Sequence, residues 1–111
     1  HLRLYDSDRA KAQALADQIG TRAQVEICSS VEAAVSGAAG LVNGTPVGML
    51  PNRDSPVPAD LIRKSQWVAD AVYHPLWTPL LKAAQKGGAM VMTGRELSIN
   101  QAVDAFALFT G

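Results

Sequence analysis

The sequence has one cysteine, Cys28, in 111 residues, which excludes an internal disulfide or a metal site built from several cysteines. It has no excess charge, because 10 Lys and Arg balance 10 Asp and Glu, and this argues against a nucleic-acid binder or a polybasic membrane-surface module. No apolar run approaches the roughly 20 residues that a membrane-spanning helix needs. Metal-ligand spacing of His, Cys and carboxylates is absent, and so is the G-x-S-x-G motif of hydrolases.

The chain also lacks an initiator Met and a signal peptide. It opens at His1 in a strand-like run and stops at Gly111 just after a helical pattern. Its hydrophobic fraction of 48% is that of a globular protein, and its length is that of one small domain. We therefore expect residues 1–111 to form one domain, cut from a longer cytoplasmic protein.

The first half of the chain alternates short strands with helices. Strands are expected at Leu2–Tyr5, 24–28 and Gly40–Asn43. Asp8 is expected to cap a helix that carries an apolar stripe and stops at Gly20. The stripe consists of Ala12, Leu15, Ala16 and Ile19. Ser29 and Glu32 have the spacing of a capping box, which predicts a second helix through Val35.

The second half continues the alternation after a long loop. Residues 43–58 are rich in Gly, Pro and Asn, and a loop of this length is often functional. One or two helical turns at 59–64 and a strand at Trp67–Tyr73 follow. Thr78-Pro79 predicts the start of a helix that Gly87-Gly88 ends. A fifth strand at 89–92 precedes a last helix, whose expected apolar face is Ile99, Ala102, Val103, Phe106 and Phe109.

Strands that alternate with helices and are continuously apolar predict a doubly wound, parallel α/β sheet. Ligands of such sheets bind beyond the carboxyl ends of the strands. The residues that follow the expected strands are therefore candidates, and several are small or polar: Asp6, Cys28-Ser29, Asn43-Gly44-Thr45, residues 70–73 and Thr93-Gly94.

Two of these candidates have a specific chemistry and also a plainer interpretation. An acid at Asp6 could accept both hydroxyls of an adenosine ribose and repel a 2′-phosphate, or Asp6 could be only a turn residue. Gly44 and Gly48 could let the backbone approach a ligand beside the Thr45 hydroxyl, or they could form an ordinary turn. No G-x-G-x-x-G phosphate motif occurs in the chain.

Four blocks of the chain resemble the shikimate dehydrogenase family. They are Asn43-x-Thr45-Pro46-x-Gly48-Met49, then Asp70-x-x-Tyr73-x-Pro75 with Thr78-Pro79-Leu80-Leu81, then Gly94 through Gln101, and finally Phe109-Thr110-Gly111. Their order and spacing span most of the chain, which is far more specific than a lone glycine motif. The run from Gln101 to Phe106 is most similar to the NAD-using quinate/shikimate dehydrogenase branch.

This resemblance implies a Rossmann-like cofactor-binding domain that lacks its first strand and glycine-rich turn. It implies an enzyme of the aromatic amino acid pathway, with reversible hydride transfer between NAD(P)H and 3-dehydroshikimate or 3-dehydroquinate. A separate N-terminal domain, which carries the catalytic groups, would bind most of the substrate. The chain alone is therefore expected to be inactive and to bind NAD weakly. An open sheet edge would also permit a homodimer.

The resemblance assigns cofactor-binding roles to six residues. Members that use NADP have Asn-Arg-Thr where this chain has Asp6-Ser7-Asp8, so the phosphate-binding arginine is absent and NAD is the expected cofactor. Lys11 matches a second basic position near the adenosine ribose, although it could equally be a solvated helix-surface lysine. The positions that match the nicotinamide side of the cofactor are Asn43, Thr45, Ala71 and Gly94.

Two residues match positions that contact the substrate. Tyr73 matches a tyrosine near the substrate carboxylate, and otherwise it would be an anchored core aromatic. Gln101 matches a glutamine that binds the ring hydroxyls, and otherwise it would be an exposed helix residue. Leu97-Ser98 depart from the family pattern, which has Met-Leu there, and Ser98 introduces a polar group at an apolar position.

Two other classes of protein remain as alternatives. One is another Rossmann dehydrogenase, such as a methylene-tetrahydrofolate dehydrogenase, which the Tyr73 and Gln101 blocks disfavour. The other is a nucleotide-sensing domain without catalytic activity.

Overall fold

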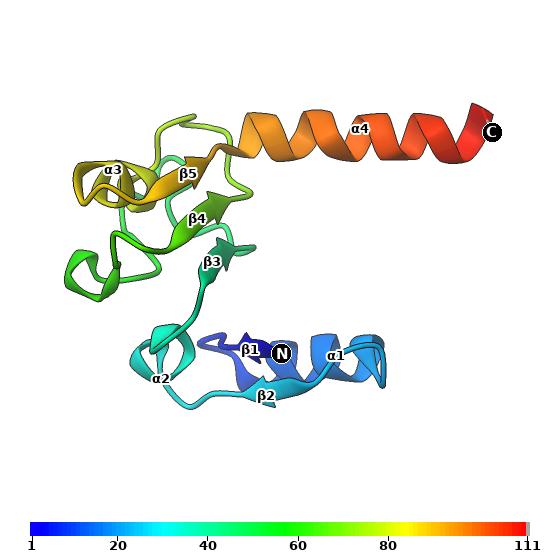
Figure 1. Ribbon diagram of the computed structural model, residues 1–111, viewed down its shortest axis with the longest axis horizontal. Coiled ribbons are helices and arrows are strands. Elements are labelled where there is room, and N and C mark those ends of the chain that lie inside the picture. Colours follow the sequence, from blue (N-terminus) through cyan, green and yellow to red (C-terminus); the bar gives the residue numbers. More distant parts are fainter. Residues whose placement is uncertain (111) are drawn as a thin grey trace. The chain divides into compact units, whose positions relative to one another are not determined.

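The computed structural model describes the backbone of residues 1–110 and the side chains except those of residue 102 and residues 105–110. The chain divides into two compact units, His1–Ala38 and Ala39–Gly111. Figure 1 shows the order of the elements along the chain, in which helices alternate with strands. Every strand pair is parallel, as the sequence predicts for an α/β fold.

The first unit is a two-stranded parallel sheet with two helices. Strand β1 (Leu2–Leu4) pairs with β2 (Val25–Ile27), and α1 (Arg9–Ile19) connects them. Asp8 caps α1, since its carboxylate accepts a hydrogen bond from the backbone N–H of Ala10 at 3.1 Å. Gly20 ends α1 at a φ of +58°, a backbone conformation that favours glycine. Both helix ends are therefore where the sequence predicts them.

One expectation for the first unit is wrong in detail. Helix α2 (Val31–Val35) is capped by Ser30, whose hydroxyl accepts from the Ala33 N–H, and not by Ser29 with Glu32. Two adjacent serines offer the same chemistry, and the backbone leaving β2 is extended at Ser30, which makes this residue the cap. In the stripe of α1, only Ala12 is buried, whereas Leu15 is 46% exposed.

The second unit is a three-stranded parallel sheet in the order β3-β4-β5. Its strands are β3 (Gly40–Asn43), β4 (Trp67–Asp70) and β5 (Met90–Met92). A 3-10 turn (Ala59–Leu61) precedes β4, α3 (Pro79–Lys86) joins β4 to β5, and α4 (Gly94–Thr110) follows β5. Thr78 caps α3 and Gly87 follows it, as the sequence predicts.

Strand β4 is shorter than the expected strand, which extended to Tyr73. The carboxylate of Asp70 accepts a hydrogen bond from the N–H of Val72 at 3.0 Å. This contact between a residue and the amide two positions later turns the chain out of the strand. The strand therefore ends at Asp70, and the residues up to Tyr73 belong to a loop.

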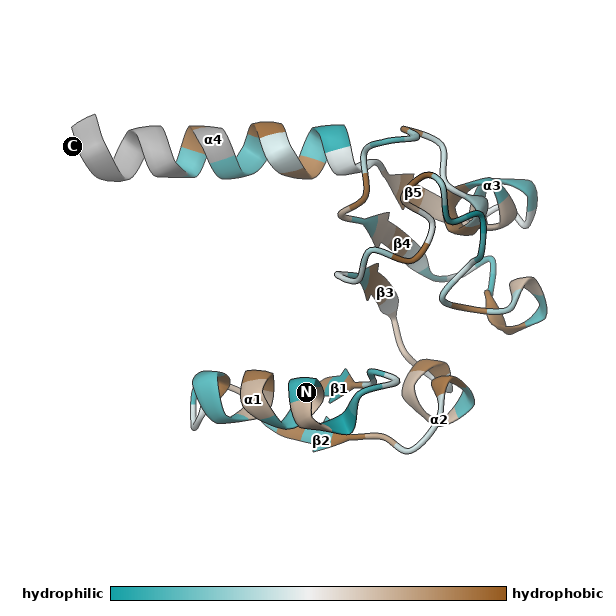
Figure 2. Cartoon of the chain, turned by 180° about the vertical axis from the view of Figure 1, so that it is seen from behind, coloured by the Kyte–Doolittle hydropathy of each residue, from teal (hydrophilic) through white to brown (hydrophobic). Residues whose placement is uncertain are grey.

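The core of the second unit lies between α3 and its sheet. Leu80, Leu81 and Ala84 of α3 are buried, together with Leu41 of β3 and Val68 of β4. In β3 the exposed Val42 lies between the buried Leu41 and Asn43, as a pleated strand requires, whereas three consecutive residues of β4, 68–70, are all buried. The exposed residues are Val42, Trp67 and Met90, and Figure 2 shows the apolar character of these strands.

Part of the expected apolar face of the last helix lies outside the described residues. This applies to the side chains of Ala102, Phe106 and Phe109, and to Gly111 of the final sequence block. Within the described part of that face, Ile99 and Val103 are 53% and 60% exposed. None of the described helices is long and apolar enough to cross a membrane.

Candidate functional site

The candidate site of the second unit lies where β3, β4 and β5 end. Parallel strands bring their carboxyl ends to one edge of the sheet, so Asn43 and Asp70 lie side by side in the register of β3 and β4. The backbone N–H of Ala71 donates to the carbonyl of Asn43 at 2.9 Å, and the Leu50 N–H donates to the carbonyl of His74 at 3.1 Å. Backbone hydrogen bonds therefore hold the loops that follow β3 and β4 together.

The turn after β3 is organised by the side chain of Asn43, which is 5% exposed. Its Oδ1 accepts from the N–H of Thr45 at 3.1 Å and from the Thr45 hydroxyl at 2.6 Å. Its Nδ2 donates to the carbonyl of Val47 and to the Asp70 carboxylate, both at 3.1 Å. The N–H of Val47 donates to Thr45 Oγ1 at 3.2 Å. Asn43 and Thr45, both predicted site residues, thus form one hydrogen-bonded turn.

Farther along this loop, Asn52 holds the chain in a second turn. Its Oδ1 accepts from the N–H of Gly48 at 3.2 Å and from that of Asp54 at 2.8 Å. Gly48 has a φ of +95°, which favours glycine, and Thr78 Cβ lies 3.7 Å from the place where a Cβ of Gly48 would be. The loop from 43 to 58 is therefore ordered by its own polar side chains, although it has no periodic secondary structure.

Asp70 connects this turn to α3. Its carboxylate is 0% exposed and accepts from the Thr78 hydroxyl at 2.8 Å. Thr78 Oγ1 in turn accepts from the N–H of Leu81 at 3.2 Å, as a helix cap does. One buried carboxylate therefore joins the end of β3, the end of β4 and the beginning of α3.

The first residue of α4 lies directly against the loop after β4. A Cβ built on Gly94 would stand 2.8 Å from the carbonyl oxygen of Ala71 and in still closer contact with the carbonyl oxygen of Val72. Only glycine allows this approach without a backbone shift. The structure thus brings together Ala71 and Gly94, which the sequence predicts as cofactor-binding positions.

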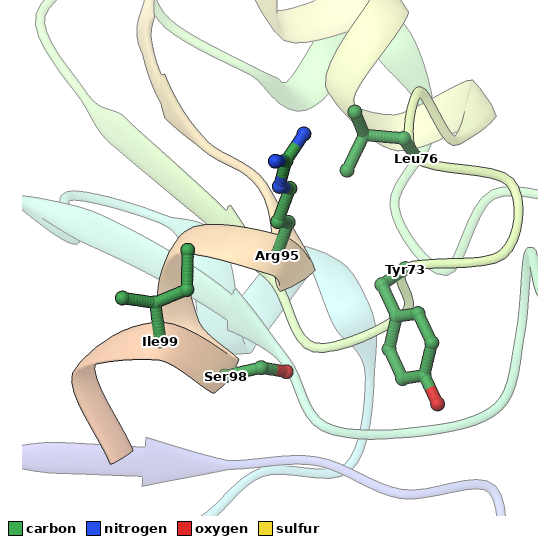
Figure 3. A pocket seen from close by; sticks show the side chains of 5 residues that line it. All are labelled: Tyr73, Leu76, Arg95, Ser98 and Ile99. Carbon is green, nitrogen blue, oxygen red and sulfur yellow. The ribbon is translucent and has the colours of Figure 1, made fainter. Parts of the chain in front are cut away.

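A hollow of about 550 Å³ lies between this loop and the first turns of α4. It is lined by Tyr73, Leu76, Arg95, Ser98 and Ile99. Tyr73 is 66% exposed, so it is not an anchored core aromatic. In Figure 3 the Ser98 hydroxyl points toward the Tyr73 ring, whereas the Arg95 side chain extends toward Leu76. No described residue pairs with the Arg95 guanidinium.

The other predicted substrate residue, Gln101, is exposed on α4 and does not line this hollow. Ser98 lies one helical turn before it. Since Ser98 is exposed, its polar group at an apolar family position does not disturb a packed face of α4.

Two predicted cofactor residues, Asp6 and Lys11, belong to the first unit. Asp6 follows β1 and is half-buried, and its Oδ1 accepts from the N–H of Asp8 at 2.8 Å. Asp6 therefore does form a turn before α1, and Oδ2 receives no hydrogen bond from the described residues. Lys11 is exposed on the first turns of α1.

Asp70 was among the candidate residues 70–73, but its contacts with Asn43 and with the helix cap Thr78 were not predicted, and neither was the turn held by Asn52. Asp70 interrupts a continuous apolar run, and an ionisable residue in a buried strand needs hydrogen-bond partners. Within the described residues, no group of three His, Cys, Asp or Glu side chains could hold a metal ion.

The comparisons with known proteins agree with the parallel α/β fold of the chain. No family model matches the chain. The chain is 41% identical over 115 residues to the quinate/shikimate dehydrogenase (NAD(+)) of Corynebacterium efficiens, covering 99% of this chain and 40% of its relative. The NADP(+) shikimate dehydrogenase of Streptomyces avermitilis is 36% identical over 116 residues, covering 100% of this chain and 40% of the relative.

The chain is also similar to solved structures of quinate and shikimate dehydrogenases. Quinate dehydrogenase from Corynebacterium glutamicum in complex with NAD matches with a TM-score of 0.84 and 39% identity, over 99% of this chain and 41% of that one. Shikimate 5-dehydrogenase from Thermus thermophilus in complex with NADP(H) and shikimate matches with a TM-score of 0.80 and 35% identity, over 98% and 40%. The chain spans about 40% of the length of the curated relatives it matches. It belongs to the shikimate dehydrogenase family.

Proposed function

We propose that the protein carrying this chain is an NAD-linked dehydrogenase that oxidises a ring hydroxyl of shikimate or quinate and reduces the corresponding ketone. Residues 1–111 are its cofactor-binding domain in this proposal. The observation that carries it is the meeting of the Asn43–Thr45 turn, Ala71 and Gly94 at one edge of the sheet, in a chain of this family. Open parallel sheets bind nucleotides at this edge.

The residues at this edge fit a nicotinamide nucleoside. Gly94 and the loop after β4 bring two stretches of backbone within contact distance, and Gly44 leaves open space where a Cβ would stand. Thr45 adds a hydroxyl whose direction is fixed by the buried amide of Asn43. A bound nicotinamide supplies the hydride acceptor, and the protein orients it.

The hollow beside Tyr73 fits the substrate side of the same proposal. Its lining combines apolar side chains with the Tyr73 phenol, the Ser98 hydroxyl and the Arg95 guanidinium. A ring that carries hydroxyls and a carboxylate needs this mixture of surfaces. Tyr73 would donate to the carboxylate, and Gln101, farther along α4, would bind ring hydroxyls.

The choice of NAD over NADP rests on Asp6. Its Oδ2 can accept a hydrogen bond from an adenosine ribose hydroxyl, and the negative charge would repel a 2′-phosphate. Ser7 supplies no positive charge that could bind such a phosphate. Lys11 would lie near the ribose in this proposal.

The test measures the absorbance of reduced nicotinamide with the full-length protein. Shikimate and quinate are each offered with NAD and with NADP. Turnover of either substrate with NAD supports the whole proposal. Turnover with NADP alone would keep the family activity but refute the role of Asp6, and no turnover with any pair would refute the proposed reaction.

A second assay tests whether the 111-residue chain is catalytically active without the rest of the protein. The 111-residue chain alone is expected to show no turnover, because the catalytic groups are assigned to another domain. Measurable dehydrogenase activity of the isolated chain would contradict this assignment. Its affinity for NAD, measured by calorimetry, is expected to be weaker than micromolar.

A further inference from the structure

The carboxylate of Asp70 is buried without a cation beside it. Among the described residues, the ion pairs are those of His1 and Arg3 with Glu26, so neutral groups supply all three hydrogen bonds to Asp70. These donors are Asn43 Nδ2 at 3.1 Å, the Val72 N–H at 3.0 Å and the Thr78 hydroxyl at 2.8 Å. A buried charge held only by neutral donors is costly, which points to a role beyond the fold.

The direction of these hydrogen bonds can be followed from Asp70 to Thr45. A carboxylate only accepts, so Asn43 presents its Nδ2 to Asp70, as it does to the Val47 carbonyl, and its Oδ1 then faces Thr45, whose N–H donates to it. This oxygen receives the hydroxyl proton of Thr45 at 2.6 Å. Because the Thr45 proton is thus engaged, the hydroxyl can offer only an acceptor to any ligand.

The acceptor capacity of Thr45 is also limited. A hydroxyl oxygen has two lone pairs, and the N–H of Val47 takes one of them at 3.2 Å. One lone pair remains. A ligand that meets Thr45 Oγ1 must therefore donate a hydrogen bond, as a ribose hydroxyl does.

We propose that Asp70 is a positioning residue that acts through Asn43 to present Thr45 Oγ1 as a fixed acceptor for a hydroxyl group of the ligand. Asp70 itself touches no ligand, since its side chain is fully buried. The inference rests on the proposed function, in which that hydroxyl belongs to the nicotinamide ribose. A site fixed before binding loses less free energy in ordering its groups, so Asp70 increases the affinity for the cofactor.

A double-mutant cycle on the full-length protein tests this chain of contacts. Thr45→Val removes the acceptor and is expected to raise the Kd for NAD about tenfold. Asp70→Asn replaces the carboxylate that holds Asn43 together with the Val47 carbonyl by a weaker acceptor, and is expected to raise the Kd about fivefold. If Asp70 acts through Thr45, the double variant is about tenfold weaker, like Thr45→Val alone. A roughly fiftyfold loss, the product of the single effects, would overturn the inference.

Thr78→Val is the matched control, because it removes the hydrogen bond to the other oxygen of Asp70. It is expected to lower the melting temperature while the Kd for NAD stays within about twofold of the wild-type value. Asp70→Asn should raise the KM for NAD and leave the KM for shikimate or quinate unchanged. A loss of NAD affinity in Thr78→Val equal to that in Asp70→Asn would show a merely structural role. Wild-type protein that binds neither NAD nor NADP would refute the proposed function and, with it, this inference.

Discussion

Gly94 at the beginning of α4 lies against the carbonyl oxygen of Ala71, which a Cβ on Gly94 would approach to 2.8 Å. The oxygen belongs to the backbone, so it cannot move aside as a flexible side chain would. This contact fixes where α4 begins relative to the loop that follows β4. It therefore also places Ser98 of α4 beside the loop that carries Tyr73, and both residues line the hollow.

Gly94→Ala is expected to destabilise the protein by about 1 to 3 kcal/mol, because the added methyl group forces α4 away from the loop. The KM for NAD should rise as well, since Ala71 and Gly94 would separate. Urea unfolding and steady-state kinetics measure the two effects. Gly87→Ala is the control: Gly87 has right-handed helical φ and ψ, and a Cβ there would lie 3.4 Å from Ala83 O, an ordinary contact. Equal stability of the two variants would contradict the close approach at Gly94.

Asp6→Asn is expected to weaken the proposed preference for NAD over NADP. The amide can still accept from the N–H of Asp8, so the turn is kept while the negative charge is lost. The ratio of kcat/KM for NADP to kcat/KM for NAD should rise about tenfold, because a charge near the 2′-phosphate no longer repels it. A smaller rise is expected at high salt, where the charge is screened.

Asp17→Asn provides the control for Asp6, since it makes the same change of charge near the other end of α1. Asp17 is exposed, and its Oδ1 accepts from Gln13 Nε2 at 2.9 Å, a bond that an amide can also accept. The ratio for the two cofactors is expected to stay at its wild-type value. A similar rise in both variants would show that net charge, and not the position of Asp6, determines the preference.

The elements with strong local chemistry could be predicted from the sequence, and the contacts between distant residues could not. Thr78-Pro79 and Gly20 specify helix ends through their own side chains or backbone freedom, so their positions were correct. The predicted end of β4 was wrong because the Val72 N–H donates a hydrogen bond to the Asp70 carboxylate, and this contact turns the backbone there. An apolar run carries no information about such a contact.

For the candidate site, the sequence predicted the residues at the strand ends but not the contacts that connect them. The blocks around Asn43, Ala71 and Gly94 could be placed at strand ends, and the structure brings them together. Their connection through Asp70 depends on the register of β3 with β4, which sequence periodicity does not specify. The exposure of Leu15 could not be foreseen either, because a stripe shows which residues share a face and not what covers it.

Thr78→Val is expected to destabilise the protein by about 2 to 4 kcal/mol. The valine has the same shape, but it leaves the Leu81 N–H without its cap and one buried oxygen of Asp70 without a donor. Thr78→Ser keeps the hydroxyl and should lose about 1 kcal/mol or less. Ser30→Ala, which removes the cap of α2, should cost about 1 kcal/mol. If urea unfolding gave Thr78→Val and Ser30→Ala the same loss, the buried contact to Asp70 would contribute nothing.

Ser98→Leu introduces the residue type that the family resemblance leads us to expect at this position, and it should change the choice of substrate without affecting stability. Ser98 is exposed and lines the hollow beside Tyr73, so a leucine there narrows the hollow and breaks no packed contact. Quinate carries one more hydroxyl than shikimate and needs more room and another polar partner. The ratio of kcat/KM for quinate to kcat/KM for shikimate should therefore fall about tenfold. Ser98→Ala removes the hydroxyl without filling the space, so it separates the loss of a polar contact from the loss of volume. An unchanged ratio in both variants would show that Ser98 does not face the substrate.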